Sequence, residues 1–393
     1  MKSLRLIAIN VGIAMGILLV LFVILEIAAR IYLVHFASPE QFKRYASLRQ
    51  LEAHRDKLGN SLQRYTPHRY IGYIPTPNYV EGKNRHNSLG YRGAEIPQPK
   101  PKGEFRIVCI GGSTTYTADV EDWHLSYPAQ LQTMLQDKGY NVRVVNAGAE
   151  SWMSYESLIN FELRVLDLHP DMIIVYHAIN DIVGRFVWPH SAYKGDNSGA
   201  KGPRVTRIFM PSIWEYSTLI RFLLIRTGHA LPQSSIDATL NNWQDTFVGY
   251  KWYEQNRDGD YPQGVFVKEP ASAMLQDNPP EFFRRNISAI VEIAKYHGIV
   301  PVLATFAHSK NFEDNPWSSS KEIAGSFDES NRIIKEIAKN HGAILFDFAS
   351  EFTFDKTLYT DGFHVNEKGA HKKAALFAAF LIDRGLLPRP AAQ

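Results

Sequence analysis

A serine, an aspartate and a histidine stand where together they could transfer an acyl group. Ser113 ends "RIVCIGGS", in which an apolar run breaks into two glycines, and Asp361 and His364 lie three residues apart in "YTDGFHVN". Acyl transfer requires a nucleophile, a base that takes its proton and a group that orients the base. The Ser113 hydroxyl, the His364 imidazole and the Asp361 carboxylate supply these parts.

Two further blocks could stabilise the negative charge that develops on the substrate oxygen. Gly148 lies in "NAGAES" and Asn180 in "HAIND". The N–H groups of Ser113 and Gly148, with the Asn180 side-chain amide, are expected to form an oxyanion hole. Other residues beside these blocks could line the pocket: Gly112, Thr114, His177, Asp181 and His308.

These residues also have structural interpretations. Ser113 could simply cap a helix, and Asn180 could be a turn residue. Asp181 is more readily a hydrogen-bond partner within the fold than a catalyst. His177 and His308 could equally lie in the core or at the rim of the pocket as structural residues.

Composition and motifs exclude several other kinds of site. The glycines lack the lysine of a phosphate-binding loop, and no G-x-G-x-x-G dinucleotide fingerprint is present. There is no H-E-x-x-H, and Cys109 is the one cysteine, so no metal or cofactor is expected. The formal net charge of +3 gives no indication of nucleic-acid binding. Cys109 itself is expected to be a small buried side chain.

From Phe105 onward, apolar runs alternate with segments of helical spacing. The runs 105–112, 142–148, 171–178, 299–307 and 343–349 are short and β-branched, which is typical of buried strands. Helical segments separate or follow them, at 127–140, 154–168, 279–298, 320–342 and 366–385. This alternation predicts an α/β fold: a three-layer α/β/α sandwich with a central parallel sheet of about five strands. Ligands of such sheets bind at the carboxyl ends of the strands, where the candidate residues lie.

Two segments do not belong to this alternation. Residues 182–278 form an insertion too long for an ordinary loop, and it contains Trp188, Trp214, Trp243 and Trp252. We expect it to be a cap or lid over the strand ends of a domain that spans 105–393. Residues 38–104 are basic and rich in turn residues, and we expect an extended tether that packs on that domain. Within it, "NSLGYRG" is too specific in its turn residues for a plain linker.

The N-terminal residues 1–37 are expected to be a membrane anchor. Residues 6–25 carry no charge, and about twenty apolar residues suffice to cross a bilayer as a helix. A cleaved signal peptide would have a shorter apolar core and a better cleavage site. More basic residues follow the span than precede it, which opposes export of the domain, although large domains translocate largely regardless of charge. Glu26 and Arg30 are four residues apart and can pair on one helix face.

The four blocks "GGST", "NAG", "IND" and "DGFH" resemble those of the SGNH (GDSL-type) serine hydrolase family, in the family's order. The resemblance covers 105–386 apart from the insertion. It implies the three-layer sandwich and the roles given above to Ser113, Gly148, Asn180, Asp361 and His364. One departure is Ala178, which stands where the family's third block usually has glycine, a position that shapes the turn.

The resemblance implies several substrates and a location. Anchored members act outside the cytoplasm, in the periplasm or at the cell surface, on acyl groups of bacterial polysaccharides. Some remove O-acetyl groups and others transfer acetyl groups received from a membrane-embedded acyltransferase. We therefore expect an esterase or O-acyltransferase with a glycan or acyl-ester substrate. A lipid esterase or lysophospholipase is one alternative, and a non-catalytic glycan-binding assembly subunit is another.

Overall fold

The computed structural model describes residues 2–47, 50, 53–54, 64–186, 190, 193–196, 216–229, 271–309, 312, 321–352 and 354–388. Most of the predicted insertion 182–278, including its four tryptophans, lies outside the described residues, as does residue range 55–63 of the predicted tether. The chain divides into two compact units. One comprises Met1–Gln63 and Arg204–Asn242, and the other comprises Arg64–Pro203 and Trp243–Gln393.

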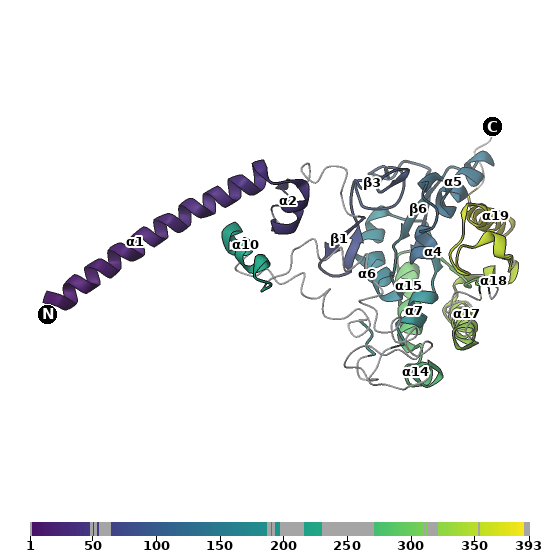
Figure 1. Cartoon of the computed structure of the whole chain (residues 1–393). Coiled ribbons are helices and arrows are strands. Elements are labelled where there is room, and N and C mark those ends of the chain that lie inside the picture. Colours follow the sequence, from purple (N-terminus) through teal and green to yellow (C-terminus); the bar gives the residue numbers. More distant parts are fainter. Residues whose placement is uncertain are drawn as a thin grey trace. The chain divides into compact units, whose positions relative to one another are not determined.

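The second unit, which we call the sheet unit, is built on a five-stranded parallel sheet (Figure 1). The strand order is β6-β5-β7-β8-β9. The strands are β5 (Phe105–Gly111), β6 (Val142–Gly148), β7 (Met172–Tyr176), β8 (Val300–Ala304) and β9 (Ile344–Phe346). Gly111 at the end of β5 lies in register with Gly148 and Tyr176, so the residues that follow these strands meet at one edge. The predicted parallel sheet is confirmed.

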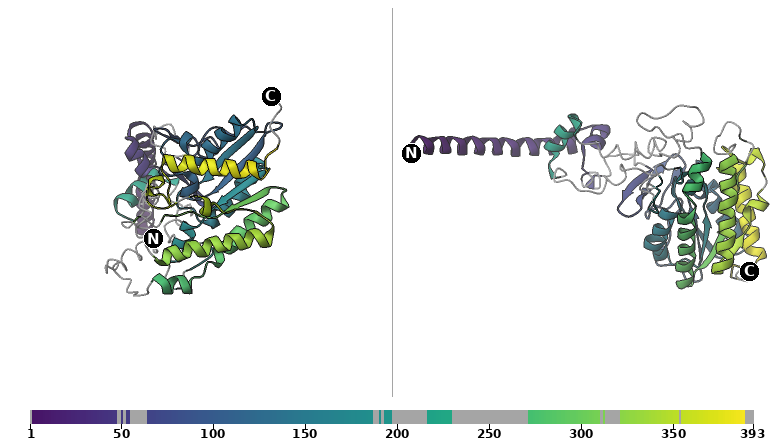
Figure 2. Two further views of the ribbon diagram at one scale, coloured as in Figure 1. Left: turned by 90° about the vertical axis from the view of Figure 1, so that its right-hand side faces the viewer. Right: turned by 90° about the horizontal axis from the view of Figure 1, so that it is seen from below.

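Helices cover both faces of the sheet, and Figure 2 shows the layers. Alternate residues of β5 face opposite sides: Ile107 and Cys109 contribute to one apolar cluster and Val108 and Ile110 to the other. Side chains of α5 (Tyr127–Asp137) and α19 (Glu367–Asp383) fill the first cluster. Side chains of α15 (Glu281–Tyr296), of the second half of α17 (Lys321–His341) and of the turns at 161–168 after α6 (Ser154–Asn160) fill the other. The chain therefore forms the predicted α/β/α sandwich, with Cys109 fully buried.

Several helices end where the sequence predicts. The backbone at Gly298, Gly342 and Gly385, just after α15, α17 and α19, has positive φ, which glycine adopts without steric cost. The predicted helix 154–168 has more than one geometry. After α6, a π-helical turn spans Phe161–Val165 and a 3₁₀ turn spans Leu166–Leu168.

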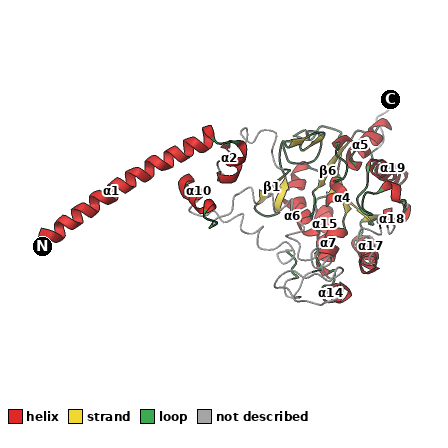
Figure 3. Ribbon diagram, viewed as in Figure 1, coloured by secondary structure: helices red, strands yellow, loops and turns green. Residues whose placement is uncertain are grey.

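Residues 64–104 are part of the sheet unit and form short antiparallel pairs (Figure 3). Strand β1 (Tyr65–His68) pairs with β2 (Gly72–Pro75), and β3 (Val80–Glu81) pairs with β4 (Asn84–Arg85). The backbone carbonyl of Tyr73 in β2 accepts a hydrogen bond of 3.2 Å from the indole N–H of Trp152, which is almost fully buried. This segment therefore packs onto the residues that follow β6.

The other unit consists of α1 (Lys2–Ile31), a π-helical turn at Tyr32–Phe36, α2 (Pro39–Tyr45) and α10 (Thr218–Arg226). The helical stretch Arg5–Phe36 is long and apolar enough to cross a membrane, a property that signal sequences share. Side chains from the last three of these segments form a small apolar cluster. Its buried members are Leu33, Phe42, Tyr45, Ala46 and Ile225, with Phe222 packed against them.

A matched pair of leucines tests the packing of the sheet unit. Leu131 on α5 is fully buried, whereas Leu163 is 47% exposed. We expect Leu131→Ala to lower the free energy of unfolding by about 2–5 kcal/mol, because it leaves a cavity between α5 and the sheet. Leu163→Ala should change it by less than about 0.5 kcal/mol. Urea denaturation of the full-length protein in detergent measures both, and equal effects would contradict this packing.

Candidate active site

Ser113, His364 and Asp361 form a continuous hydrogen-bonded chain. Ser113 Oγ lies 2.7 Å from His364 Nε2, and His364 Nδ1 lies 2.7 Å from Asp361 Oδ2. Asp361 Oδ1 also accepts the N–H groups of Phe363 and His364, at 3.1 and 2.8 Å, which fix the carboxylate. This arrangement allows His364 to take a proton from Ser113 while Asp361 stabilises the resulting imidazolium.

The charges around His364 suit a general base. Burial acts to lower the pKa of His364, but the hydrogen bond and charge of Asp361 outweigh it, helped by the charges of Asp119 and Glu150. The net result is a raised pKa. Burial acts to raise the pKa of Asp361, but its hydrogen bonds to His364 and Phe363 and the charge of His364 lower it overall. Asp361 is therefore a carboxylate at neutral pH.

Neighbouring atoms lie so close to the two residues before Ser113 that only glycine fits at either position. A Cβ at Gly111 would lie 2.1 Å from Thr115 Oγ1 and 2.6 Å from the carbonyl oxygen of Tyr176. A Cβ at Gly112 would lie 2.6 Å from Asn180 Nδ2. Ser113 then begins α4 (Ser113–Tyr116), a single helical turn whose first N–H groups have no partner within the helix. The glycines thus let an amide donor approach the backbone beside the nucleophile.

Asn180 is brought to this position by the first turn of α7 (Ile179–Val183). Its Nδ2 donates to the carbonyl oxygen of Trp152 at 2.8 Å, which uses one of the two amide hydrogens. In the part of the chain that the structure describes, the second hydrogen has no acceptor. It is available to an oxygen of a substrate near Ser113.

Gly148 lies beside the nucleophile, but its N–H is not an open donor. A Cβ here would lie 2.4 Å from the backbone nitrogen of Tyr116, so only glycine lets β6 pack against α4. The Gly148 N–H donates to Asn146 Oδ1 at 3.1 Å. The structure thus gives Gly148 a packing role and bonds its N–H to Asn146, while the oxyanion role that the sequence resemblance implied stays a prediction.

Ser151 offers a donor that the sequence did not reveal. The N–H groups of Gly148, Ala149, Glu150, Trp152 and Met153 all have acceptors. The Ser151 N–H is the one in this fully described stretch for which the structure gives none. Its φ of 59° lies in the left-handed region, which a serine adopts only when its surroundings impose it. A glycine here would have marked the turn, whereas a serine gave no signal.

Three of the other predicted pocket residues have partners within the fold. Asp181 accepts the N–H and hydroxyl of Ser154, at 3.1 and 2.5 Å. Burial lowers the pKa of His177 to about 3, and its Nε2 lies 2.8 Å from the hydroxyl of Ser157. His308 stacks on Phe327, with ring centroids 4.3 Å apart.

Thr114 acts through its carbonyl oxygen, which lies 3.2 Å from Lys373 Nζ. Lys373, on α19, is fully buried, and its Nζ lies 3.5 Å from the ring centroid of Tyr176. Burial lowers the pKa of Lys373. Sequence reasoning missed this residue because it lies in a lysine pair that resembles an exposed helix face.

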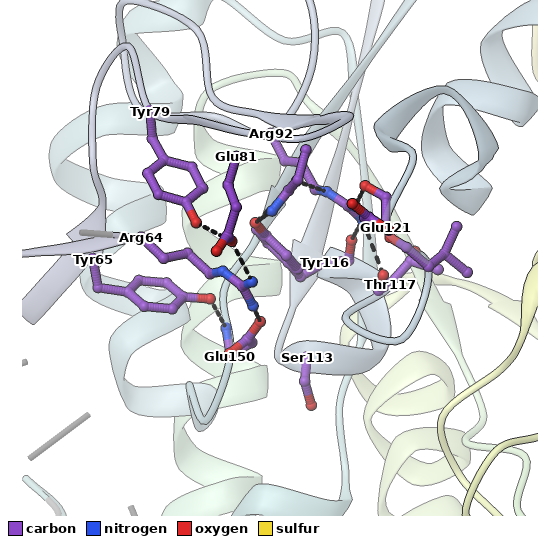
Figure 4. A network of polar contacts seen from close by, with 12 residues as sticks. Arg64, Tyr65, Tyr79, Glu81, Arg92, Ser113, Tyr116, Thr117, Glu121 and Glu150 are labelled. Carbon is purple, nitrogen blue, oxygen red and sulfur yellow. Dashed lines mark hydrogen bonds and ion pairs between the residues drawn. The ribbon is translucent and has the colours of Figure 1, made fainter. Parts of the chain in front are cut away.

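The segment before β5 holds the turn that follows β6 (Figure 4). Arg64 Nη1 lies 2.8 Å from Glu150 Oε1, and Arg64 Nη2 lies 2.9 Å from Glu81 Oε2. The Glu150 backbone is also fixed, because its N–H donates to the Tyr65 hydroxyl at 3.0 Å and its carbonyl accepts from the Tyr73 hydroxyl at 2.6 Å. These contacts fix the residue directly before Ser151.

One group of side chains could in principle bind a metal ion. Ligand atoms of Asp119, Asp361 and His364 lie within 4.8 Å of one another. However, both ring nitrogens of His364 already contact Asp361 and Ser113. A metal ion bound to His364 would displace one of these hydrogen bonds, so the arrangement fits a proton relay better than a metal centre.

The raised pKa of His364 predicts the pH dependence of turnover. Only the neutral imidazole can take the Ser113 proton, so kcat/KM for an activated ester should fall as pH drops through that pKa. Asp361→Asn should move this acidic limb to lower pH and reduce kcat by about 10⁴-fold. Asp119→Asn should move the limb in the same direction with little loss of kcat, because Asp119 acts through its charge. If the acidic limb of the pH profile moves in neither variant, His364 is not the base.

A comparison with known proteins gives a family match. Residues 109–372 match the GDSL-like Lipase/Acylhydrolase family. No curated protein matches the sequence. Among solved structures, a lipase/acylhydrolase from Enterococcus faecalis is similar, with 14% identity and a TM-score of 0.42, over 74% of this chain and 100% of that one.

An acylhydrolase described as putative from Bacteroides fragilis is similar over 74% of this chain and 92% of its own, with 17% identity and a TM-score of 0.40. The acetylxylan esterase Axe2 from Geobacillus stearothermophilus, in a catalytic-mutant form, shows 15% identity and a TM-score of 0.39, over 72% of this chain and 94% of its own. The family match covers most of the chain, including every block that carries the candidate residues. The chain therefore belongs to the GDSL-like lipase/acylhydrolase family and is a serine hydrolase of the SGNH type.

Proposed function

We propose that the protein is a membrane-anchored serine esterase or O-acyltransferase that acts on O-acetyl groups of a cell-surface polysaccharide. The observation that carries the chemistry is the pair of 2.7 Å hydrogen bonds that join Ser113 to His364 and His364 to Asp361. The reaction passes through an acyl-enzyme on Ser113. No metal or cofactor takes part in the proposed steps.

In the first half-reaction, Ser113 Oγ attacks the carbonyl carbon of the ester while His364 Nε2 accepts the hydroxyl proton. The tetrahedral intermediate places a negative charge on the former carbonyl oxygen. The N–H of Ser113, the Asn180 amide and the Ser151 N–H are the donors that we assign to it. Collapse of the intermediate breaks the ester C–O bond, and His364 returns its proton to the leaving alcohol.

In the second half-reaction, an oxygen nucleophile attacks the acyl carbon of the acyl-enzyme. His364 accepts its proton and then returns it to Ser113 Oγ. Water as the nucleophile releases a carboxylic acid, whereas a sugar hydroxyl yields a new sugar ester. Esterase and transferase therefore share every catalytic residue and differ only in the acceptor.

Several charged and polar side chains lie near the catalytic groups, which favours a hydrophilic substrate. Asp119 Oδ2 contacts the Thr360 hydroxyl next to Asp361, and the Arg64–Glu150 pair lies beside Ser151. Carboxylates and guanidinium groups can exchange hydrogen bonds with sugar hydroxyls. A lipid esterase needs an apolar groove for its acyl chain, and these residues do not provide one.

Contacts within the smaller unit support a retained anchor. The carboxylate of Glu26, directly after the apolar run, accepts hydrogen bonds from the Ser217 hydroxyl at 2.8 Å and from the N–H groups of Thr218 and Leu219, both at 2.9 Å. Arg30 Nε lies 2.6 Å from the same carboxylate, as the four-residue spacing predicts. Cleavage of α1 as a signal peptide would leave the start of α10 without this acceptor.

Retention of α1 fits a protein whose sheet unit, with the catalytic residues, is held at the outer face of a membrane, in the periplasm or at the cell surface. A membrane-embedded acyltransferase that delivers acetyl groups would be the natural partner of a transferase. The extracytoplasmic location follows from the polysaccharide substrate that we propose.

The reaction is tested with full-length protein in nanodiscs, p-nitrophenyl acetate as donor and an unacetylated oligosaccharide as acceptor. We expect Ser113-dependent release of p-nitrophenol, with the acetyl group found as acetate for an esterase or on the sugar for a transferase. Asn180→Ala should lower kcat by about 10²–10³-fold, because it removes an oxyanion donor.

Ser113→Ala is the matched control, since it removes only the nucleophilic oxygen. Faster turnover of p-nitrophenyl decanoate than of the acetate would replace the glycan substrate with a lipid one. Turnover that survives in Ser113→Ala would contradict the proposed mechanism itself.

The anchor is tested on the protein isolated from cells. We expect its N-terminal sequence to include residues 1–37 and the protein to stay with the membrane after alkaline carbonate extraction. Glu26→Gln keeps the side-chain shape but removes the charge, and it should destabilise the cluster around Phe42 and Ile225, measured by hydrogen exchange. A mature N-terminus beyond residue 37 would contradict the anchor.

A further inference from the structure

We infer that Arg92, in the "NSLGYRG" segment, is a positioning residue that holds the turn bearing Ser113. This inference rests on the proposed function in one respect, that Ser113 is the nucleophile. The segment was conspicuous in the sequence, and the proposed mechanism gives it no role. Figure 4 shows Arg92 beside Tyr116 and Thr117, at the end of the turn opposite the Ser113 side chain.

Arg92 binds a series of backbone carbonyls directly after the nucleophile. Its Nη1 lies 2.6 Å from the carbonyl oxygen of Tyr116 and 2.9 Å from that of Thr117. Its Nη2 lies 2.5 Å from the carbonyl oxygen of Val120 and 3.1 Å from that of Glu121. One planar guanidinium thus fixes four carbonyl groups of a single loop.

The turn needs this support because α4 is too short to be stable alone. Four residues cannot offset the cost of nucleating a helix. The chain leaves α4 through Thr117, whose φ of 65° lies in the left-handed region. The carbonyls at its end lack partners within the helix and must find donors elsewhere. Arg92 and Asn146 Nδ2 donate to the carbonyl of Tyr116, at 2.6 and 3.2 Å, and Lys373 donates to that of Thr114. Arg92 also supplies donors to the carbonyls of the loop that follows α4.

Burial of the Arg92 guanidinium costs free energy, which indicates that this residue has a specific role. Arg92 is 4% exposed, and its guanidinium lies 4.6 Å from the ring centroid of Tyr116. Its fifth donor, Nε, lies 2.8 Å from Asn84 Oδ1. All five of these acceptors are neutral oxygens, whereas a buried guanidinium is usually paired with a carboxylate.

The rest of the segment shapes the turn that presents Arg92. Asn87 Oδ1 accepts the N–H groups of Leu89 and Tyr91 at 3.0 and 2.9 Å, and its Nδ2 donates to the Ala94 carbonyl. Gly90 has a φ of 81°, and a Cβ there would lie 2.5 Å from the carbonyl oxygen of Pro75. The asparagine and the glycine thus serve the conformation, and the arginine makes the contact with α4.

Arg106 provides a matched control within the same unit. It is fully buried and donates to the backbone carbonyls of Leu168 and Pro97, at 2.7 and 3.1 Å. Unlike Arg92, it is paired with a carboxylate, that of Glu104 at 2.6 Å, and it lies near the start of β5, at the end of the sheet remote from Ser113. Replacing either arginine by lysine keeps the charge but loses the fork of donors.

The experiment compares Arg92→Lys with Arg106→Lys in the full-length protein, with p-nitrophenyl acetate as substrate. We expect Arg92→Lys to lower kcat by about 10–100-fold with KM within about twofold, because Ser113 loses its alignment with His364 while the pocket remains. Arg106→Lys should lower the melting temperature at least as much and leave kcat within about twofold. Asn84→Leu removes the acceptor of Arg92 Nε and should lower kcat by a smaller factor than Arg92→Lys does.

The outcomes separate this inference from the proposed function. If Arg92→Lys leaves kcat unchanged, Arg92 does not position Ser113. The same conclusion holds if both lysine variants lose kcat in proportion to their loss of melting temperature, because Arg92 would then be merely structural. If Arg92→Lys fails to fold, unchanged kcat in Asn84→Leu would overturn the inference. Activity in Ser113→Ala would instead overturn the proposed function on which the inference rests.

Discussion

The active site depends on the placement of one four-residue helical turn, α4, at the end of β5. The hydroxyl of Ser113 must reach the imidazole of His364, which lies 251 residues further along the chain, at 2.7 Å. So short a turn has little stability of its own, so its direction is set by the groups around it. Asn146, Lys373 and Arg92 donate to its carbonyls or to those just after it, and each comes from a different element.

The parallel sheet makes this convergence possible. Because β5, β6 and β7 end in register, the nucleophile, the turn with Ser151 and the Asn180 amide come to one edge. Close backbone packing then determines which residues can stand there, as the contacts of a Cβ at Gly112 or Gly148 show. Residues 64–104 complete the site from outside the sheet, by holding the Glu150 turn on one side and the loop after α4 on the other.

The sequence was sufficient to predict the five strands, the helices and the Ser–His–Asp chain. Apolar runs and helical spacing report burial directly, and the catalytic blocks lie next to strand ends. Contacts that depend on three-dimensional proximity could not be predicted in this way. No periodic pattern in the sequence indicates the direction of the Gly148 N–H, the left-handed backbone of Ser151 or the burial of Lys373. Neither does the contact between Glu26 and the start of α10, more than 190 residues away.

The central claim is that Ser113 carries the acyl group between the two half-reactions. The most direct measurement is mass spectrometry of the protein quenched soon after mixing with p-nitrophenyl acetate, followed by peptide mapping. The account predicts one added acetyl group on the peptide that contains Ser113, and its loss when water or a sugar acceptor is given time to react. An acetyl group on another residue, or turnover with an unmodified Ser113 at every time point, would contradict the account.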